Sequence, residues 1–235
     1  MLQVALTRDT PRIEDAMTLQ IGLVARNGFV LASDTLVQNR APGTKGTIRS
    51  SRTKKIHLFE AAGLVVAYAG HDPPTSFGYR LRDAWDASRA DETIDREARA
   101  WFAANPTLHP SEESEIIIGS SAHSKLWHVT GASERATVTP YLDKITTRNS
   151  LSLAPFIAEH FYSTELPLKA MTTLAALTIW YGERQGNTTI RGLQVVTCED
   201  ERIRELSNDE TNALLEECSR LHSRIGAVLL SPGAE

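Results

Sequence analysis

The chain has 235 residues, of which 41% are hydrophobic and 23% are charged, a composition that fits a single globular domain with a sizeable core. Its formal net charge of −4 argues against nucleic-acid binding, and its longest apolar run is far too short to span a membrane. Its two cysteines, Cys198 and Cys218, are too few for a disulfide framework and fit a reducing cytoplasm.

The first predicted element is a β-hairpin that follows Thr18. Apolar side chains alternate over residues 19–23, which is the period of a strand with one buried face. Asn27-Gly28 predicts a type I′ turn, because both central residues of that turn need a positive φ. Residues 29–33 predict the return strand. Its antiparallel pairing would bring Asp34 back to the end where Thr18 lies.

A polar segment and two short strands come next. Residues 38–52 contain turn-forming proline and glycine and predict a polar loop. Lys54-Lys55 then precede an apolar strand over residues 56–59. After a turn at residues 60–63, a third apolar run over residues 64–70 ends in glycine.

The rest of the chain mixes helical and strand patterns. Helical spacing predicts one helix that starts near Asp72 and ends near Ala90, and a second from Asp91 to Ala104. Later strands are predicted over residues 115–119, 125–130, 136–140, 145–147 and 191–197. Later helices are predicted over 154–162, over 167–181, and from a capping box at Ser207 to about Ser223. Periodicity alone therefore indicates an α+β domain, without the strand-helix alternation of a Rossmann fold.

Four features in residues 18–70 resemble the proteasome β-subunit family and its bacterial relatives. They are a threonine before a hairpin, an aspartate after it, a Lys-Lys-aliphatic sequence, and an apolar strand that ends in Ala-Gly. Proteins of that family are N-terminal-nucleophile hydrolases. The resemblance implies their four-layer αββα sandwich, as one peptidase domain over residues 18–235. No cofactor is expected, and no metal-ligand spacing appears among the seven histidines.

The resemblance also implies a set of site residues. Thr18 would be the nucleophile, and Asp34 and Lys55 its charged partners. Gly70 would supply an oxyanion-hole amide, and Ser150 would bind the nucleophile's amine, although Ser150 is equally suited to cap the helix that follows. The residues expected to line the pocket for the substrate residue before the cut are Val37, Thr53, His57, Tyr68 and Asp72.

The chemistry of these residue types supports the catalytic assignment. A threonine hydroxyl has almost no alkoxide near neutral pH and needs a base within hydrogen-bond reach. If Thr18 is the first residue, its own α-amine, with an ordinary pKa of about 7.7–8.0, is that base. A nearby lysine ammonium lowers the pKa of both groups. Each residue also has an ordinary structural role, since lysines before a strand usually protect a sheet edge.

The sequence departs from the family pattern at several positions. Leu36 stands where the family commonly has arginine, and Asn149 and Leu151 stand where it often has glycine. Glu183 and Gly186 occupy the places of a family aspartate and serine. These differences concern the surroundings of the site rather than its nucleophile.

Residues 1–17 admit two interpretations. They lack the apolar stretch of a signal peptide. They are either a propeptide removed by self-cleavage or the result of a start site placed too early, with translation beginning at Met17. The second is favoured, because Met17 stands where the family has glycine and methionine before threonine is readily trimmed.

The expected function is that of a cytoplasmic threonine endopeptidase acting on peptides or unfolded proteins. The resemblance implies self-assembly into a homo-oligomeric ring or split ring, with an ATP-dependent unfoldase as a candidate partner and neither nucleic acid nor membrane as one. Two alternatives remain open at this stage. One is a catalytically silent ring subunit, and the other is an N-terminal-nucleophile amidase or acyltransferase acting on a small substrate.

Overall fold

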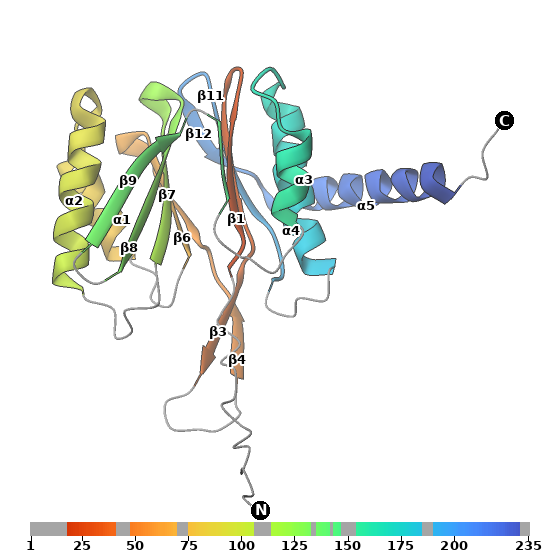
Figure 1. Cartoon of the computed structure of the whole chain (residues 1–235), viewed down its shortest axis with the longest axis horizontal. Helices are drawn as coiled ribbons and strands as arrows, with labels where there is room; N and C mark the ends of the chain where they lie inside the picture. The colour runs from red at the N-terminus through yellow and green to blue at the C-terminus, as the bar shows by residue number, and fades with distance from the viewer. Residues whose placement is uncertain are drawn as a thin grey trace, which may run out of the picture.

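The computed structural model describes residues 18–40, 48–69, 75–105, 114–132, 135–141, 143–146, 154–184 and 190–230. Within these residues, two five-stranded antiparallel sheets form the middle of the molecule (Figure 1). The first sheet has the order β10 (Lys144–Thr146), β1 (Gln20–Ala25), β2 (Gly28–Ser33), β11 (Gln194–Glu199) and β12 (Arg202–Glu205). The second has the order β5 (Ile56–Phe59), β6 (Leu64–Ala69), β7 (Ser114–Ser120), β8 (Lys125–Ala132) and β9 (Arg135–Tyr141).

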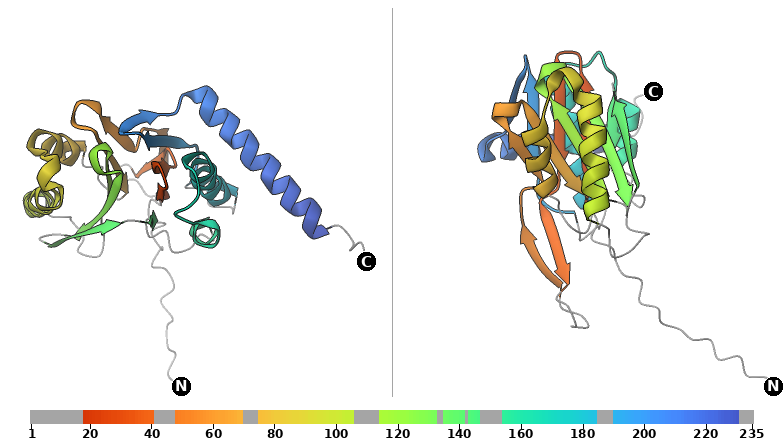
Figure 2. Two further views of the ribbon diagram at one scale, coloured as in Figure 1. Left: turned by 90° about the horizontal axis from the view of Figure 1, so that it is seen from above. Right: turned by 90° about the vertical axis from the view of Figure 1, so that its left-hand side faces the viewer.

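Helices cover the outer faces of both sheets. The helices α1 (Thr75–Ala84) and α2 (Ala90–Ala104) lie against the second sheet, and α3 (Ala154–Phe161) and α4 (Leu168–Arg184) lie against the first (Figure 1). The last helix, α5 (Asn208–Leu230), packs on α4 and extends away from the sandwich (Figure 2). This arrangement confirms the expected α+β fold with four layers, αββα.

Three hydrophobic layers hold the sandwich together. Phe29, Leu31 and Ile117 pack between the two sheets. A second cluster joins the first sheet to α3 and α4, and a third, which contains Phe77 and Trp127, joins the second sheet to α1 and α2. Because both faces of each sheet are covered, the central strands β2 and β7 are buried at every position, and their sequences read as apolar runs rather than as strict alternations.

The first hairpin forms as expected, but its turn differs from the prediction. The turn consists of Arg26 and Asn27, because Ala25 pairs with Gly28. Neither turn residue has a positive φ, so the turn is not type I′. The Asn27 side chain accepts a hydrogen bond from the Leu168 backbone N–H (3.1 Å), which attaches the turn to α4.

Two strand pairs were missed by the sequence analysis. Residues 38–52, expected to form a loop, include most of an antiparallel pair, β3 (Leu36–Arg40) and β4 (Ile48–Arg52). This pair forms a separate two-stranded sheet that projects from the sandwich (Figure 2), and its sequence has no apolar alternation that would indicate a strand. Strand β12 was also missed. Its turn from β11 consists of Asp200 and Glu201, both with positive φ, and neither is the glycine that usually signals such a turn.

Two helix boundaries also differ from the expected ones. Helix α1 ends at Ala84 rather than near Ala90. The Asp86 side chain accepts a hydrogen bond from Ser88 N–H and caps a short 3-10 turn there, before α2 begins. Helix α5 continues to Leu230, beyond the expected end near Ser223. Its start agrees with the predicted capping box, in which Ser207 and Glu210 exchange hydrogen bonds.

Gly28 offers a test of the sheet packing. Its φ is +155°, and a Cβ there would lie 1.9 Å from the carbonyl oxygen of Cys198 in β11. Gly28→Ala should therefore lower the free energy of unfolding by about 2–3 kcal/mol, because the neighbouring backbone must shift. The control is Gly226→Ala in α5, where a Cβ meets no atom within 4 Å and stability should stay equal or rise by up to about 1 kcal/mol. Urea unfolding measures both; equal effects would contradict the packing.

Candidate active site

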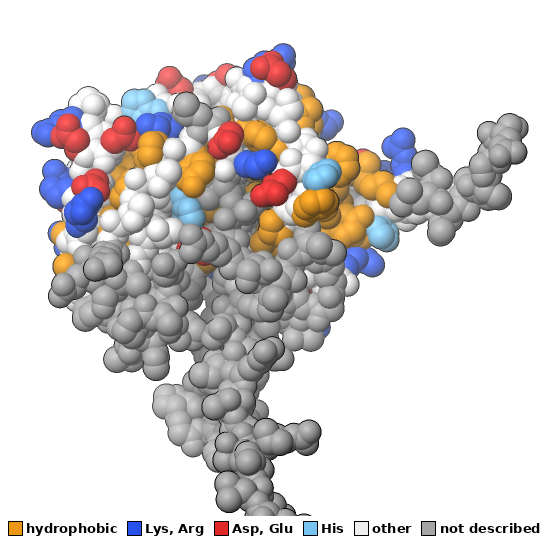
Figure 3. Space-filling view, in the orientation of Figure 1, with side chains coloured by type: hydrophobic (Ala, Val, Ile, Leu, Met, Phe, Trp, Pro, Cys, Tyr) orange, Lys and Arg blue, Asp and Glu red, His pale blue; other side chains and the backbone are white. Residues whose placement is uncertain are grey.

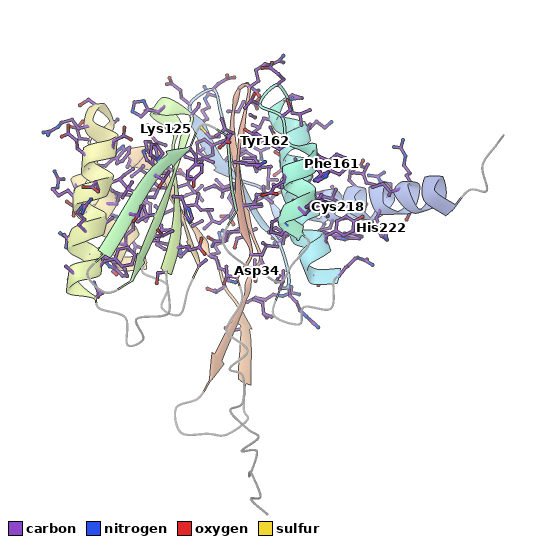
Figure 4. All side chains as sticks on the ribbon, in the orientation of Figure 1. Asp34, Lys125, Phe161, Tyr162, Cys218 and His222 are labelled. Atoms are coloured by element: carbon purple, nitrogen blue, oxygen red, sulfur yellow. The ribbon has the colours of Figure 1, made fainter. Side chains whose placement is uncertain are left out.

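The β1–β2 hairpin places Thr18 and Asp34 at the same end of the first sheet. The two strands pair in register from Ala25 opposite Gly28 to Gln20 opposite Ser33. Beyond them, Asp34 N–H donates to Leu19 O (3.1 Å), and Leu19 N–H donates to Asp34 Oδ1 (3.0 Å). Figure 4 shows Asp34 near the end of the sandwich from which the β3–β4 pair projects.

Lys55 reaches this position from the other sheet. It directly precedes β5, and its Nζ lies 2.8 Å from Asp34 Oδ2 and 3.0 Å from Thr18 Oγ1. Asp34 is fully buried and Lys55 is only 6% exposed. The three side chains therefore form a continuous chain from a carboxylate through an ammonium to a hydroxyl. Lys54, the competing lysine in the sequence, lies on the surface and pairs with Glu205 (2.6 Å).

The carboxylate of Asp34 is held on several sides. Besides Lys55 and Leu19, it accepts a hydrogen bond from the Leu36 backbone N–H at Oδ2 (3.1 Å). Burial raises the pKa of Asp34, and the Lys55 charge and the two backbone N–H groups oppose that shift. The carboxylate is thus both desolvated and oriented, which fixes the direction in which Lys55 points.

The ammonium of Lys55 is in an equally unusual setting. Burial lowers its pKa below the ordinary value, and the charge of Asp34 opposes that shift. An ammonium of this kind can donate a hydrogen bond to Thr18 Oγ1 and stabilise negative charge as it develops there. It can also take part in proton transfer at a lower pH than an exposed lysine would.

The structure describes only some of the other residues expected at the site. Gly70, Asp72 and Ser150 lie outside the described residues, and for Val37 only the backbone is described. Thr53 is exposed, and its N–H donates to Thr35 O (2.9 Å).

His57 and Tyr68 are brought together. Their rings meet edge to face with centroids 5.5 Å apart, and Tyr68 belongs to the cluster covered by α1. Burial raises the pKa of the Tyr68 phenol, whereas burial together with Lys54 lowers the pKa of His57. Of the two outer positions that differ from the family, Glu183 is exposed near the end of α4 and Gly186 lies outside the described residues.

Sequence reasoning missed two buried glutamines beside the site. Gln20, two residues after Thr18, donates from Nε2 to the Tyr68 carbonyl and so links β1 to β6 in the opposite sheet. Gln194, the first residue of β11, contacts the backbone of Lys55. Each is a polar residue inside an apolar strand, at a position where burial requires hydrogen-bond partners. That pattern was the available signal.

Basic and acidic side chains are interspersed on the face shown in Figure 3. Among the described residues, no group of three or more His, Cys, Asp or Glu side chains could hold a metal ion. No helix in this part of the chain is long and apolar enough to cross a bilayer.

Solved structures share this fold. Anbu (ancestral beta-subunit) from Yersinia bercovieri superposes with a TM-score of 0.68 and 15% identity, over 92% of this chain and 98% of that one. Anbu from Hyphomicrobium sp. strain MC1 superposes with a TM-score of 0.65 and 14% identity, over 89% of this chain and 97% of that one. Its Gly-1 mutant superposes with a TM-score of 0.62 and 15% identity, over 90% of this chain and 97% of that one. No family model and no curated protein matches the sequence. The comparison establishes a proteasome β-subunit-like fold.

The buried ion pair predicts a large effect of Asp34 on stability. Asp34→Ala should lower the free energy of unfolding by about 3–5 kcal/mol, because it leaves the buried Lys55 ammonium without its counter-charge. Lys54→Met is the matched control, since it breaks the exposed pair with Glu205 and should cost about 0–1 kcal/mol. Denaturant unfolding compares the two variants. Similar losses in both would show that the Asp34–Lys55 pair is not the buried interaction described above.

Proposed function

We propose that this chain is a threonine endopeptidase of the N-terminal-nucleophile type, with Thr18 as the nucleophile. The observation that carries the proposal is the chain of contacts from the buried Asp34 through the buried Lys55 Nζ to Oγ1 of the half-buried Thr18. A hydroxyl next to a desolvated ammonium whose own counter-ion is fixed has the setting that activates a nucleophile. The shared fold with the Anbu structures is compatible with this chemistry but does not by itself specify it.

The base in this mechanism is the α-amine of Thr18. It becomes available when residues 1–17 are absent, through self-cleavage or through a start at Met17 followed by trimming. The amine accepts the hydroxyl proton as Oγ1 bonds to the scissile carbonyl carbon, and Lys55 stabilises the developing charge on Oγ1. The amine then passes that proton to the leaving nitrogen as the peptide bond breaks, which leaves an ester on Thr18.

Hydrolysis of the ester completes the cycle. Water gives a proton to the same amine and attacks the ester carbonyl, and the proton returns to Oγ1 as the carboxylic acid product leaves. Gly70 is proposed to donate its N–H to the oxyanion in both steps, and Ser150 to bind the amine. An oxyanion donor of this kind is worth roughly 3–4 kcal/mol in comparable sites.

The substrate is proposed to be a peptide or an unfolded protein chain. Val37, Thr53, His57, Tyr68 and Asp72 would line the pocket for the residue before the cut. A peptidase in the cytoplasm needs its site enclosed, so we propose a homo-oligomeric ring or split ring, with an ATP-dependent unfoldase as a candidate supplier of chains. Exposed aromatic side chains, among them Phe156 and Phe161 of α3, offer apolar contact area for assembly.

Loss of the Thr18 hydroxyl should abolish turnover. Thr18→Ala should show neither peptide hydrolysis nor labelling by a peptide epoxyketone, because both need Oγ1. Intact-mass spectrometry of the native protein should show a chain that begins at Thr18 and gains one inhibitor mass. Thr173→Ala is the matched control, since that threonine lies on α4 and donates only to the Lys169 carbonyl. Activity in Thr18→Ala, or an intact Met1 in active protein, would refute the mechanism.

The pocket residues predict the cleavage preference. The Tyr68 phenol is nearly fully buried beside His57, and a ring at that position leaves a shallow pocket. Cleavage should therefore favour small residues before the cut, as measured by mass spectrometry of a peptide-library digest. Efficient cleavage after Phe would contradict the pocket assignment. Hydrolysis of simple amides with no cleavage of any peptide would instead favour a small-molecule amidase.

A further inference from the structure

Gln194 is buried between the two sheets with its side-chain amide fully used. It is only 5% exposed. Its Oε1 accepts hydrogen bonds from the backbone N–H groups of Lys55 and Ile56, both at 3.0 Å. Its Nε2 donates to Ile56 O (2.9 Å) and to Glu205 Oε1 (3.1 Å). An amide offers two acceptor sites and two donor hydrogens, so every hydrogen-bonding position of Gln194 is occupied.

The contacts cross from one sheet to the other. Gln194 opens β11 in the first sheet, whereas Lys55 and Ile56 lie at the start of β5, the edge strand of the second. The N–H and the carbonyl of Ile56 both bond to this one side chain. The side-chain amide of Gln194 thus makes the hydrogen bonds that a neighbouring strand would otherwise make at the free edge of β5. Without it, these buried backbone groups would lack their partners, which is costly.

Two adjacent positions of the first sheet hold Lys55, one at its backbone N–H and the other at its side-chain Nζ. Gln194 lies opposite Ser33 in the register of β11 and β2, and Asp34 directly follows Ser33. Gln194 binds the backbone N–H of Lys55, and Asp34 binds its Nζ. A long, flexible side chain is thereby fixed at its base and at its tip from adjacent points of a single sheet.

We propose that Gln194 is a positioning residue for the reaction of Thr18. It sets the position of the Lys55 backbone relative to the first sheet, and this places Nζ within hydrogen-bond distance of Thr18 Oγ1. Its side chain bonds to the backbone of Lys55 and Ile56 and to the Glu205 carboxylate, and its effect on the reaction is transmitted through Lys55. The inference rests on the proposed function for its kinetic consequence, whereas its structural part concerns the Lys55 and Ile56 amides alone.

Two variants separate this role from general packing. Gln194→Met keeps the length and burial of the side chain and removes all of its hydrogen bonds. Gln194→Glu keeps acceptors for the Lys55 and Ile56 N–H groups, but it cannot donate to Ile56 O, and it places a carboxylate next to that of Glu205. Thr197→Val is the matched control, because Thr197 is a buried polar residue three positions further along β11. All three would be made in the full chain, with thermal melting as the check of folding.

The first readout is the rate of Thr18 labelling by a peptide epoxyketone at several concentrations. Gln194→Met should lower the maximal labelling rate by at least about tenfold, because a small displacement of a catalytic group is costly. Its half-saturating concentration should stay close to that of the parent, since substrate contacts are unchanged. The maximal labelling rate of Gln194→Glu should lie between those of Gln194→Met and the parent. Thr197→Val should be labelled as fast as the parent.

The second readout does not need activity. Hydrogen-deuterium exchange should be faster at the Lys55 and Ile56 amides in Gln194→Met than in the parent or in Thr197→Val. A parent protein that is not labelled at Thr18 would refute the proposed function, and the exchange data would still test the contact. The positioning role is wrong if Gln194→Met is labelled as fast as the parent. It is also wrong if Thr197→Val lowers the labelling rate as much as Gln194→Met does. If Gln194→Met does not fold, Gln194→Glu decides: parent-like labelling together with faster exchange at the Lys55 amide overturns the inference, whereas slower labelling with faster exchange supports it.

Discussion

The structure depends on the enclosure of one ammonium group between two sheets. Removing a charged lysine from water costs several kcal/mol, and only a close counter-charge with well-placed hydrogen bonds offsets that cost. Asp34 supplies the charge at 2.8 Å, and the Leu19 and Leu36 N–H groups hold Asp34 in turn. Each element therefore has to arrive in register: the β1–β2 hairpin for Asp34, and the start of β5 for Lys55.

The sandwich provides this register because it combines short-range with long-range constraints. The hairpin brings Thr18 and Asp34 together over a short stretch of chain, so their proximity follows from local pairing. Lys55 comes from the other sheet, so its approach depends on how the sheets stack. Phe29, Leu31 and Ile117 fix that stacking, and Gln20 and Gln194 add hydrogen bonds across it. Apolar contacts hold the layers together, whereas the two amides bond to particular backbone groups of the opposite sheet.

This division explains what the sequence could and could not predict. The hairpin, the α+β class and most helices follow from periodicity, which acts over neighbouring residues. The approach of Lys55 to Thr18 was anticipated only through a family resemblance, since no local pattern encodes contact between sheets. Strand β12 was missed because its turn consists of Asp200 and Glu201 and contains no glycine, and the β3–β4 pair was missed because its sequence has no apolar alternation. The role of Gln194 also depends on strand pairing that is distant in sequence.

The position of Leu36 shows how a change of side chain can leave a site intact. The family commonly has arginine there, which suggested a missing supporting charge. In this structure the contact from residue 36 to Asp34 is made by the backbone N–H, and every residue type except proline supplies that donor. The carboxylate therefore keeps a donor at that position while the side chain is free to differ. Where the local chain path is held by strand pairing, as it is for Leu36 opposite Arg52, the geometry of the carboxylate survives a loss of sequence likeness.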